Sequence, residues 1–103
     1  MMKTCFCSVI FPNNLRYFKT FLNSLENQTD KEFILLLFND GVVNLDSYLL
    51  NCSLKYKIIS VSGSIGEVRT KMLEYLKKST FTSIIFGDTD DYFPKNRVAI
   101  NKL

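Results

Sequence analysis

The segment Phe33-Ile34-Leu35-Leu36-Leu37-Phe38 is an unbroken run of six large apolar side chains. Such a run is too short for a typical helix, and it lacks the alternation of a strand that has one face in water. It therefore predicts a central strand of a parallel sheet, covered by helices on both faces. The turn-forming sequence Asn39-Asp40-Gly41 follows at once and ends this strand.

The rest of the chain alternates between strand patterns and helix patterns. We expect further strands at 4–11, 56–61 and 83–86, and helices at 46–51, at about 67–78 and from Pro94 onward. An Asn cap after Pro12 is expected to start an amphipathic helix that runs to about Gln28, because apolar residues recur there at helical spacing. This order predicts one α/β domain, with a mostly parallel four-stranded sheet and flanking helices in a Rossmann-like arrangement.

The composition fits a globular protein and excludes several classes. The chain has 103 residues, of which 47% are hydrophobic, and this is enough for a real core. A formal charge of +3 is too small and too dispersed to indicate a nucleic-acid partner. Because no transmembrane segment or signal peptide is recognisable, we expect a cytoplasmic protein, with peripheral attachment to the inner face of the membrane as a variant.

The cysteines and the lack of histidine limit the chemistry. Cys5, Cys7 and Cys52 are the only cysteines, and a strand would point the first two to the same face. A zinc site lacks ligands here, so we expect buried reduced thiols. Without histidine there is no Ser-His or Cys-His nucleophile, and carboxylates must carry the chemistry.

Three carboxylates, Asp88, Asp90 and Asp91, lie within four residues just after the strand predicted at 83–86. Like charges this close repel one another unless a cation, a basic side chain or open water relieves them. We favour a bound metal, and a solvated acidic turn closed by Pro94 is the alternative. In parallel sheets, ligands bind outside the carboxyl ends of the strands. The predicted topology brings the acidic cluster to that edge together with the loops at 12–14, 39–41 and 62–66.

The order of these signals resembles the nucleotide-binding half of the family-2 glycosyltransferases, which have the GT-A fold. Four segments carry the resemblance in sequence order: Val9-Ile10-Phe11-Pro12-Asn13-Asn14 with the helix that follows, Phe33 to Gly41, Gly66 to Arg69, and Asp88-Thr89-Asp90-Asp91 with Pro94. The resemblance implies that residues 1–103 form a single domain that binds a nucleotide-diphospho-sugar donor. The sugar would be transferred to an acceptor that the sequence does not identify.

The resemblance also implies roles for four residues on the nucleotide side. Pro12 and Asn14 would line the nucleobase pocket, and Asp40 would accept a hydrogen bond from an N–H group of the base. Arg69 would contact the nucleotide through its planar guanidinium group. The alternative interpretation, which does not use the resemblance, is that Asp40 is an ordinary Asp-Gly turn residue and that Arg69 is a solvent-facing helix residue.

On the diphosphate side, the resemblance places Asp88 next to the ribose or the sugar. Asp90 and Asp91 would hold Mn²⁺ or Mg²⁺, which in turn binds the diphosphate of the donor. The metal would stabilise the negative charge that develops on the leaving nucleoside diphosphate.

The sequence departs from the family's pattern in several places. Gly87 stands where an apolar residue is usual, Val68 and Thr70 replace the small Ala and Asn, and Asn39 stands where an acid is common. No Asp, Glu or His follows Asp91, although family members carry the base that activates the acceptor in a second half. We therefore expect the chain to be the donor-binding half of a longer transferase, truncated at its C-terminal end and inactive alone.

Two other functions are compatible with the sequence. A non-catalytic α/β binding module would keep the fold, and apolar surface on the sheet edge and last helix would then favour a homo-oligomer or another partner. An Asp-nucleophile phosphohydrolase is the third hypothesis, because Asp88-Thr89-Asp90 follows a strand. The ordered upstream segments argue against it.

Overall fold

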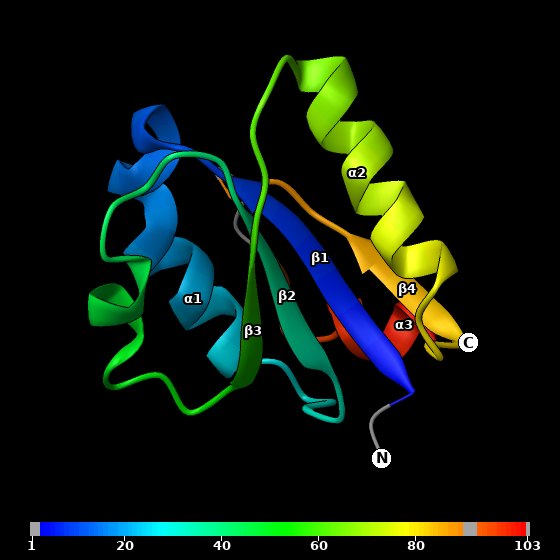
Figure 1. Cartoon of the computed structure of the whole chain (residues 1–103). Helices are drawn as coiled ribbons and strands as arrows, with labels where there is room; N and C mark the ends of the chain where they lie inside the picture. The colour runs from blue at the N-terminus through cyan, green and yellow to red at the C-terminus, as the bar shows by residue number, and fades with distance from the viewer. Residues whose placement is uncertain (1–2, 90–92, 103) are drawn as a thin grey trace.

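A computed structural model describes residues 3–89 and 93–102. Four strands form one parallel sheet in the order β3-β2-β1-β4 (Figure 1). The elements in chain order are β1 (Thr4–Ile10), the 3₁₀ segment η1 (Pro12–Tyr17), α1 (Phe18–Glu26), β2 (Ile34–Asn39), the 3₁₀ segment η2 (Leu45–Leu49), β3 (Lys55–Ser60), α2 (Ile65–Lys77), β4 (Ser83–Phe86) and α3 (Arg97–Asn101). The predicted α/β class and the four predicted strands are confirmed.

The apolar run at 33–38 forms most of β2, which lies inside the sheet between β1 and β3. Leu35 to Phe38 are buried on both faces, as the absence of alternation predicts. β1 and β2 end level with one another, since Ile10 lies opposite Asn39 in the register. The turns that follow these two strands therefore begin side by side.

Helices cover both faces of the sheet (Figure 1). On one face, α1 and α3 enclose the larger part of the core, in which Phe6 packs edge-on against Phe93 with ring centroids 5.0 Å apart. On the other face, α2 packs through Leu76 on a smaller cluster around Leu36 and Phe38. One helix covers this second face, and it leaves β4 partly exposed there.

Cys5 and Cys7 lie under α2 on the same face of β1, as predicted, with their Sγ atoms 3.6 Å apart. Both thiols are free and buried. The contact with Cys5, together with burial, raises the pKa of the Cys7 thiol far above its ordinary value. The same contact lowers the pKa of the Cys5 thiol, and both cysteines are buried core residues.

The helices differ from the prediction mainly at their N-terminal ends. The first α-helix begins at Phe18, and Asn14 instead caps η1 by accepting a hydrogen bond from the Phe11 amide at 2.9 Å. The segment predicted as a helix at 46–51 is the 3₁₀ segment η2. Helix α3 begins only at Arg97, because Pro94 first enters a turn in which its carbonyl accepts from the Arg97 amide at 3.1 Å.

Helix α2 begins at a capping box. The Ser64 hydroxyl accepts from the Glu67 amide at 3.2 Å, and the Glu67 carboxylate accepts from the Ser64 amide at 3.0 Å. The bond from the Ser64 amide, with a smaller contribution from the Ser64 hydroxyl, holds the pKa of the Glu67 carboxylate below its usual value. The cap fixes the first turn of α2 and so places Arg69 early in the helix. With 13 residues, α2 is the longest helix that the structure describes. No helix within the described residues is long and apolar enough to span a bilayer.

Candidate functional site

A cavity of about 550 Å³ lies at the carboxyl ends of β1 and β4, between the sheet and α2. Its α2 wall is apolar and is formed by Ile65, Val68, Met72 and Leu73. Its polar groups come from residues that lie far apart in the sequence, namely Ser8, Asn14, Asp40, Arg69, Asp88 and Thr89. A cavity with an apolar wall and a few convergent polar groups is typical of a small-molecule site.

The structure brings four of the predicted site residues together. Asn14, Asp40, Arg69 and Asp88 all line the cavity, whereas Pro12 is not among its described lining residues. Pro12 instead begins η1, where a proline suits the first position. The predicted metal ligands Asp90 and Asp91 lie outside the described residues.

Asp40 is held by the turn that ends β2. Its amide donates to the Ile10 carbonyl at 2.8 Å, and Gly41 follows with a φ of +91°, which favours glycine. The Asn39 side chain closes the turn, since its amide nitrogen donates to the Val42 carbonyl at 2.9 Å and its oxygen accepts from the Val42 amide at 2.8 Å. A carboxylate cannot make the first of these bonds. The asparagine at position 39 is therefore explained by the turn.

Gly87 is required by close packing at the end of β4. A Cβ atom at this position would lie 2.6 Å from the Phe93 ring and 2.7 Å from the Phe6 ring. Both rings are buried, so neither has open space into which it could move. The packing of the aromatic core therefore explains why glycine, and not a larger apolar residue, stands at position 87. Asp88 directly follows this tightly packed residue.

The charges around the cavity are not neutralised by one another. Among the described residues there is one ion pair, between Lys102 and Asp30, and Arg69 therefore pairs with neither Asp40 nor Asp88. Arg69 and Asp88 are exposed, and Asp40 is half-buried. A guanidinium group and two carboxylates are thus available to a ligand at one edge of the sheet.

Thr89 is a site residue that the sequence interpretation missed. Its side chain is fully buried, and its hydroxyl accepts a hydrogen bond from the Asn14 amide group and lies 3.4 Å from the Val9 carbonyl. This contact joins the turn after β1 to the turn after β4. No local pattern indicates it, because the two partners are 75 positions apart in the sequence.

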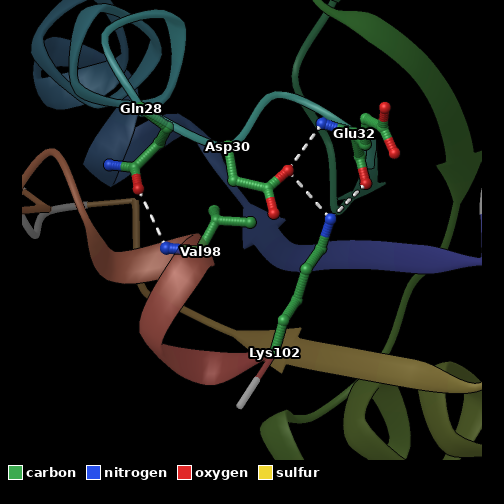
Figure 2. A network of polar contacts seen from close by, with 5 residues as sticks. All are labelled: Gln28, Asp30, Glu32, Val98 and Lys102. Atoms are coloured by element: carbon green, nitrogen blue, oxygen red, sulfur yellow. Dashed lines mark hydrogen bonds and ion pairs between the residues drawn. The ribbon is translucent and has the colours of Figure 1, made fainter.

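Residues 93–102 are held by a polar network that the sequence also did not predict (Figure 2). Gln28 is buried, its oxygen accepts from the Val98 amide at 2.9 Å, and its nitrogen donates to the carbonyls of Pro94 at 2.6 Å and Ser24 at 3.0 Å. Lys102 donates to the Asp30 carboxylate at 2.9 Å, and this contact holds the pKa of Asp30 below its usual range. Residues 93–102 are therefore tied to the connection between α1 and β2.

The described residues do not by themselves form a metal centre. Within residues 3–89 and 93–102, no three Asp, Glu, Cys or His side chains gather in a way that could hold a metal ion. Asp88 contributes one exposed carboxylate, an oxygen ligand of the kind that Mn²⁺ and Mg²⁺ accept. Metal binding stays a prediction from the sequence of the acidic turn.

In comparisons with known proteins, no family model and no curated protein matches the chain. The resemblance to the family-2 glycosyltransferases therefore rests on the quoted residues and on the parallel α/β sheet. The sheet establishes the fold class, but a fold of this kind supports many functions.

Proposed function

We propose that the chain is the donor-binding part of a glycosyltransferase and that its cavity takes a nucleotide-diphospho-sugar. The observation that carries the proposal is the convergence of Asn14, Asp40, Arg69 and Asp88 on one cavity. These four residues were selected from the sequence alone, and they come from three strand ends and the first turns of α2. The carboxyl edge of a parallel sheet is also where α/β proteins bind nucleotides.

The chemistry of the cavity residues suits such a donor. Asp40 offers a carboxylate that accepts from an N–H group of a base, and Asp88 offers one that accepts from a sugar hydroxyl. Arg69 donates to diphosphate oxygens through a planar, permanently charged group. The apolar side chains of Val68 and Met72 exclude water from the α2 side of the cavity.

Asp90 and Asp91 would hold the Mn²⁺ or Mg²⁺ ion, adjacent in sequence to Asp88. When bound, the metal supplies positive charge that stabilises the leaving nucleoside diphosphate. The proposal covers donor binding rather than complete transfer, because the sequence after Asp91 contains no Asp, Glu or His to deprotonate an acceptor.

Calorimetric titration with UDP and with GDP, each in the presence of Mn²⁺, tests this proposal. We expect one of the two nucleotides to bind the wild type and to bind Asp88→Asn at least about tenfold more weakly, because a charge-assisted contact is lost. Removal of the metal by EDTA and the Asp90→Ala substitution should weaken binding to a similar extent. Asp46→Asn is the matched control, since Asp46 is an exposed carboxylate on η2 outside the cavity lining. Equal binding by the wild type and Asp88→Asn, or no binding of either nucleotide, would contradict the proposal.

A self-associating α/β module is a second candidate function, and the two edges of the sheet favour it. The β3 edge carries the exposed charges of Lys55 and Lys57, which deter pairing with another strand. Strand β4 itself has no charged residue, although the Arg97 guanidinium group donates to the Phe86 carbonyl at 3.0 Å. The side chains of Ile84 and Phe86 are 38% and 48% exposed on the α2 face of this edge strand. Two copies that pair at their β4 strands would cover both apolar edges and leave the lysine-bearing edges outside, which gives a closed dimer.

Sedimentation velocity over a range of concentrations tests the dimer. We expect a monomer–dimer equilibrium for the wild type and a monomer for Ile84→Lys, because an exposed charge on an edge strand opposes pairing with another strand. Tyr56→Lys is the matched control, since Tyr56 is 38% exposed and lies on the opposite edge strand. A monomeric wild type, or a dimer that persists in Ile84→Lys, would exclude this interface.

A further inference from the structure

We propose that Asn14 and Thr89 are positioning residues: their side chains form a bridge that fixes Asp88 in the cavity, and Thr89 does not contact the ligand itself. The consequence for ligand binding rests on the proposed function. The bridge itself is present in the ligand-free protein, so it can be tested without a ligand.

The bridge joins three points of the chain. The Thr89 hydroxyl accepts from the Asn14 amide nitrogen and lies 3.4 Å from the Val9 carbonyl, to which it donates. The Asn14 oxygen accepts from the Phe11 amide at 2.9 Å, so the same side chain also closes the turn after β1. Both ends of the Asn14 amide group are thus engaged within the protein.

The bridge acts on Asp88 because it fixes the residue that follows. On the other side, the Gly87 amide donates to the Cys7 carbonyl at 3.1 Å, which is the last rung between β4 and β1. Asp88 therefore lies between two residues that are both bonded to β1, while its own side chain is exposed at the cavity. Loss of the Thr89 hydrogen bonds would leave Asp88 fixed only through the bond between Gly87 and Cys7.

The burial of Thr89 separates a positioning role from ligand contact. Thr89 borders the cavity, but its exposed fraction is 0% and its hydroxyl is satisfied by protein groups. A residue in this position influences a ligand through its neighbour, as the outer-shell partners of metal ligands do. For Asn14, this adds a positioning role to the cavity-lining role that the resemblance implies.

Calorimetry with UDP and Mn²⁺ on Thr89→Val tests the consequence for binding. Valine keeps the shape of threonine and removes the hydroxyl, so we expect binding about tenfold weaker than in the wild type. Thr89→Ser should restore most of the affinity. Thr89→Val should have no further effect in an Asp88→Asn background, because the bridge acts through Asp88. Thr82→Val removes a hydroxyl at the opposite end of β4 and serves as the matched control.

Amide hydrogen exchange without ligand tests the bridge itself. In Thr89→Val we expect the Phe11 amide to exchange several-fold faster than in the wild type, because the Asn14 oxygen that covers it is no longer held in place. Thr89→Ser and Thr82→Val should leave this rate unchanged. An unchanged Phe11 rate in Thr89→Val overturns the bridge.

The two measurements separate the failure of the inference from the failure of the proposed function. If the wild type does not bind UDP with Mn²⁺, the exchange rate of the Phe11 amide alone decides whether the bridge exists. If UDP binds and Thr89→Val weakens it equally with and without the Asp88 carboxylate, Thr89 acts on the fold in general. That result overturns the positioning of Asp88.

Discussion

Replacement of Gln28 by glutamate is expected to lower the free energy of unfolding by about 3 kcal/mol at neutral pH. The Gln28 nitrogen donates to two carbonyls, those of Ser24 and Pro94, at a site that is almost fully buried. A carboxylate oxygen in its place would face both carbonyls without a proton to share. The oxygen that accepts from the Val98 amide is retained, so the substitution isolates the donor side of the side chain.

The effect should depend on pH, and its sign follows from burial. Burial and the two carbonyls favour the protonated form of the introduced carboxyl, so its pKa in the folded protein lies above the unfolded value of about 4.3. At pH values between these two pKa values, the unfolded chain binds fewer protons than the folded chain. The free energy of unfolding of the variant therefore falls as the pH rises. Urea unfolding at pH 4 and at pH 7 measures this, after correction for the wild type at each pH.

Asn27→Asp is the matched control for Gln28→Glu, because it makes the same change from amide to carboxylate at the adjacent, exposed position. We expect it to change stability by less than about 0.5 kcal/mol. A comparable loss in both variants, or a Gln28→Glu deficit that shrinks toward neutral pH, would show that the bonds from the Gln28 nitrogen to Ser24 and Pro94 do not hold the C-terminal segment.

The second large effect is expected for Gly87→Ala, which should destabilise the protein by about 3 kcal/mol. The added methyl group would lie within 2.8 Å of ring atoms of Phe6 and Phe93, and these rings are packed against Phe21 as well. Relief of these contacts requires the rings of Phe6 and Phe93 to shift against Phe21. Thermal unfolding measures the stability, and near-ultraviolet circular dichroism reports the change in aromatic packing.

Gly66→Ala makes the same chemical change where the structure leaves room. No atom lies within 4 Å of the added group, and Gly66 is in the first turn of α2. Alanine has the higher helix propensity, so this variant should be unchanged or more stable by up to about 1 kcal/mol. A stable, native-like Gly87→Ala protein would refute the packing argument for the glycine.

The strands were predictable from sequence because their signals are local. The apolar run at 33–38 requires burial on both faces whatever its surroundings, and the structure places it inside the sheet. The pair Cys5 and Cys7 shares one face because side chains alternate along any strand. The helix starts were less predictable, since the spacing of apolar residues around Leu15 is compatible with both a 3₁₀ segment and an α-helix.

The site was predictable where residues follow strand ends, and not where it depends on distant partners. Topology alone brings Asp40 and Asp88 to the same edge, because parallel strands end there. Thr89 gave no signal, since its role depends on a contact with Asn14 across the whole chain. Gln28 gave none either, because a glutamine at the end of an amphipathic helix looks like a solvated residue until its partners at 94 and 98 are known.

The separation between Gln28 and its partners has a consequence for folding. The Gln28 bonds to Pro94 and Val98 span 66 and 70 positions, so they close long loops in the chain. Contacts of this range form late, since the entropy of loop closure must be overcome first. During synthesis, Gln28 leaves the ribosome well before the residues that it will bind. The cavity at the sheet edge is therefore expected to be completed only after residues 86–98 have left the ribosome.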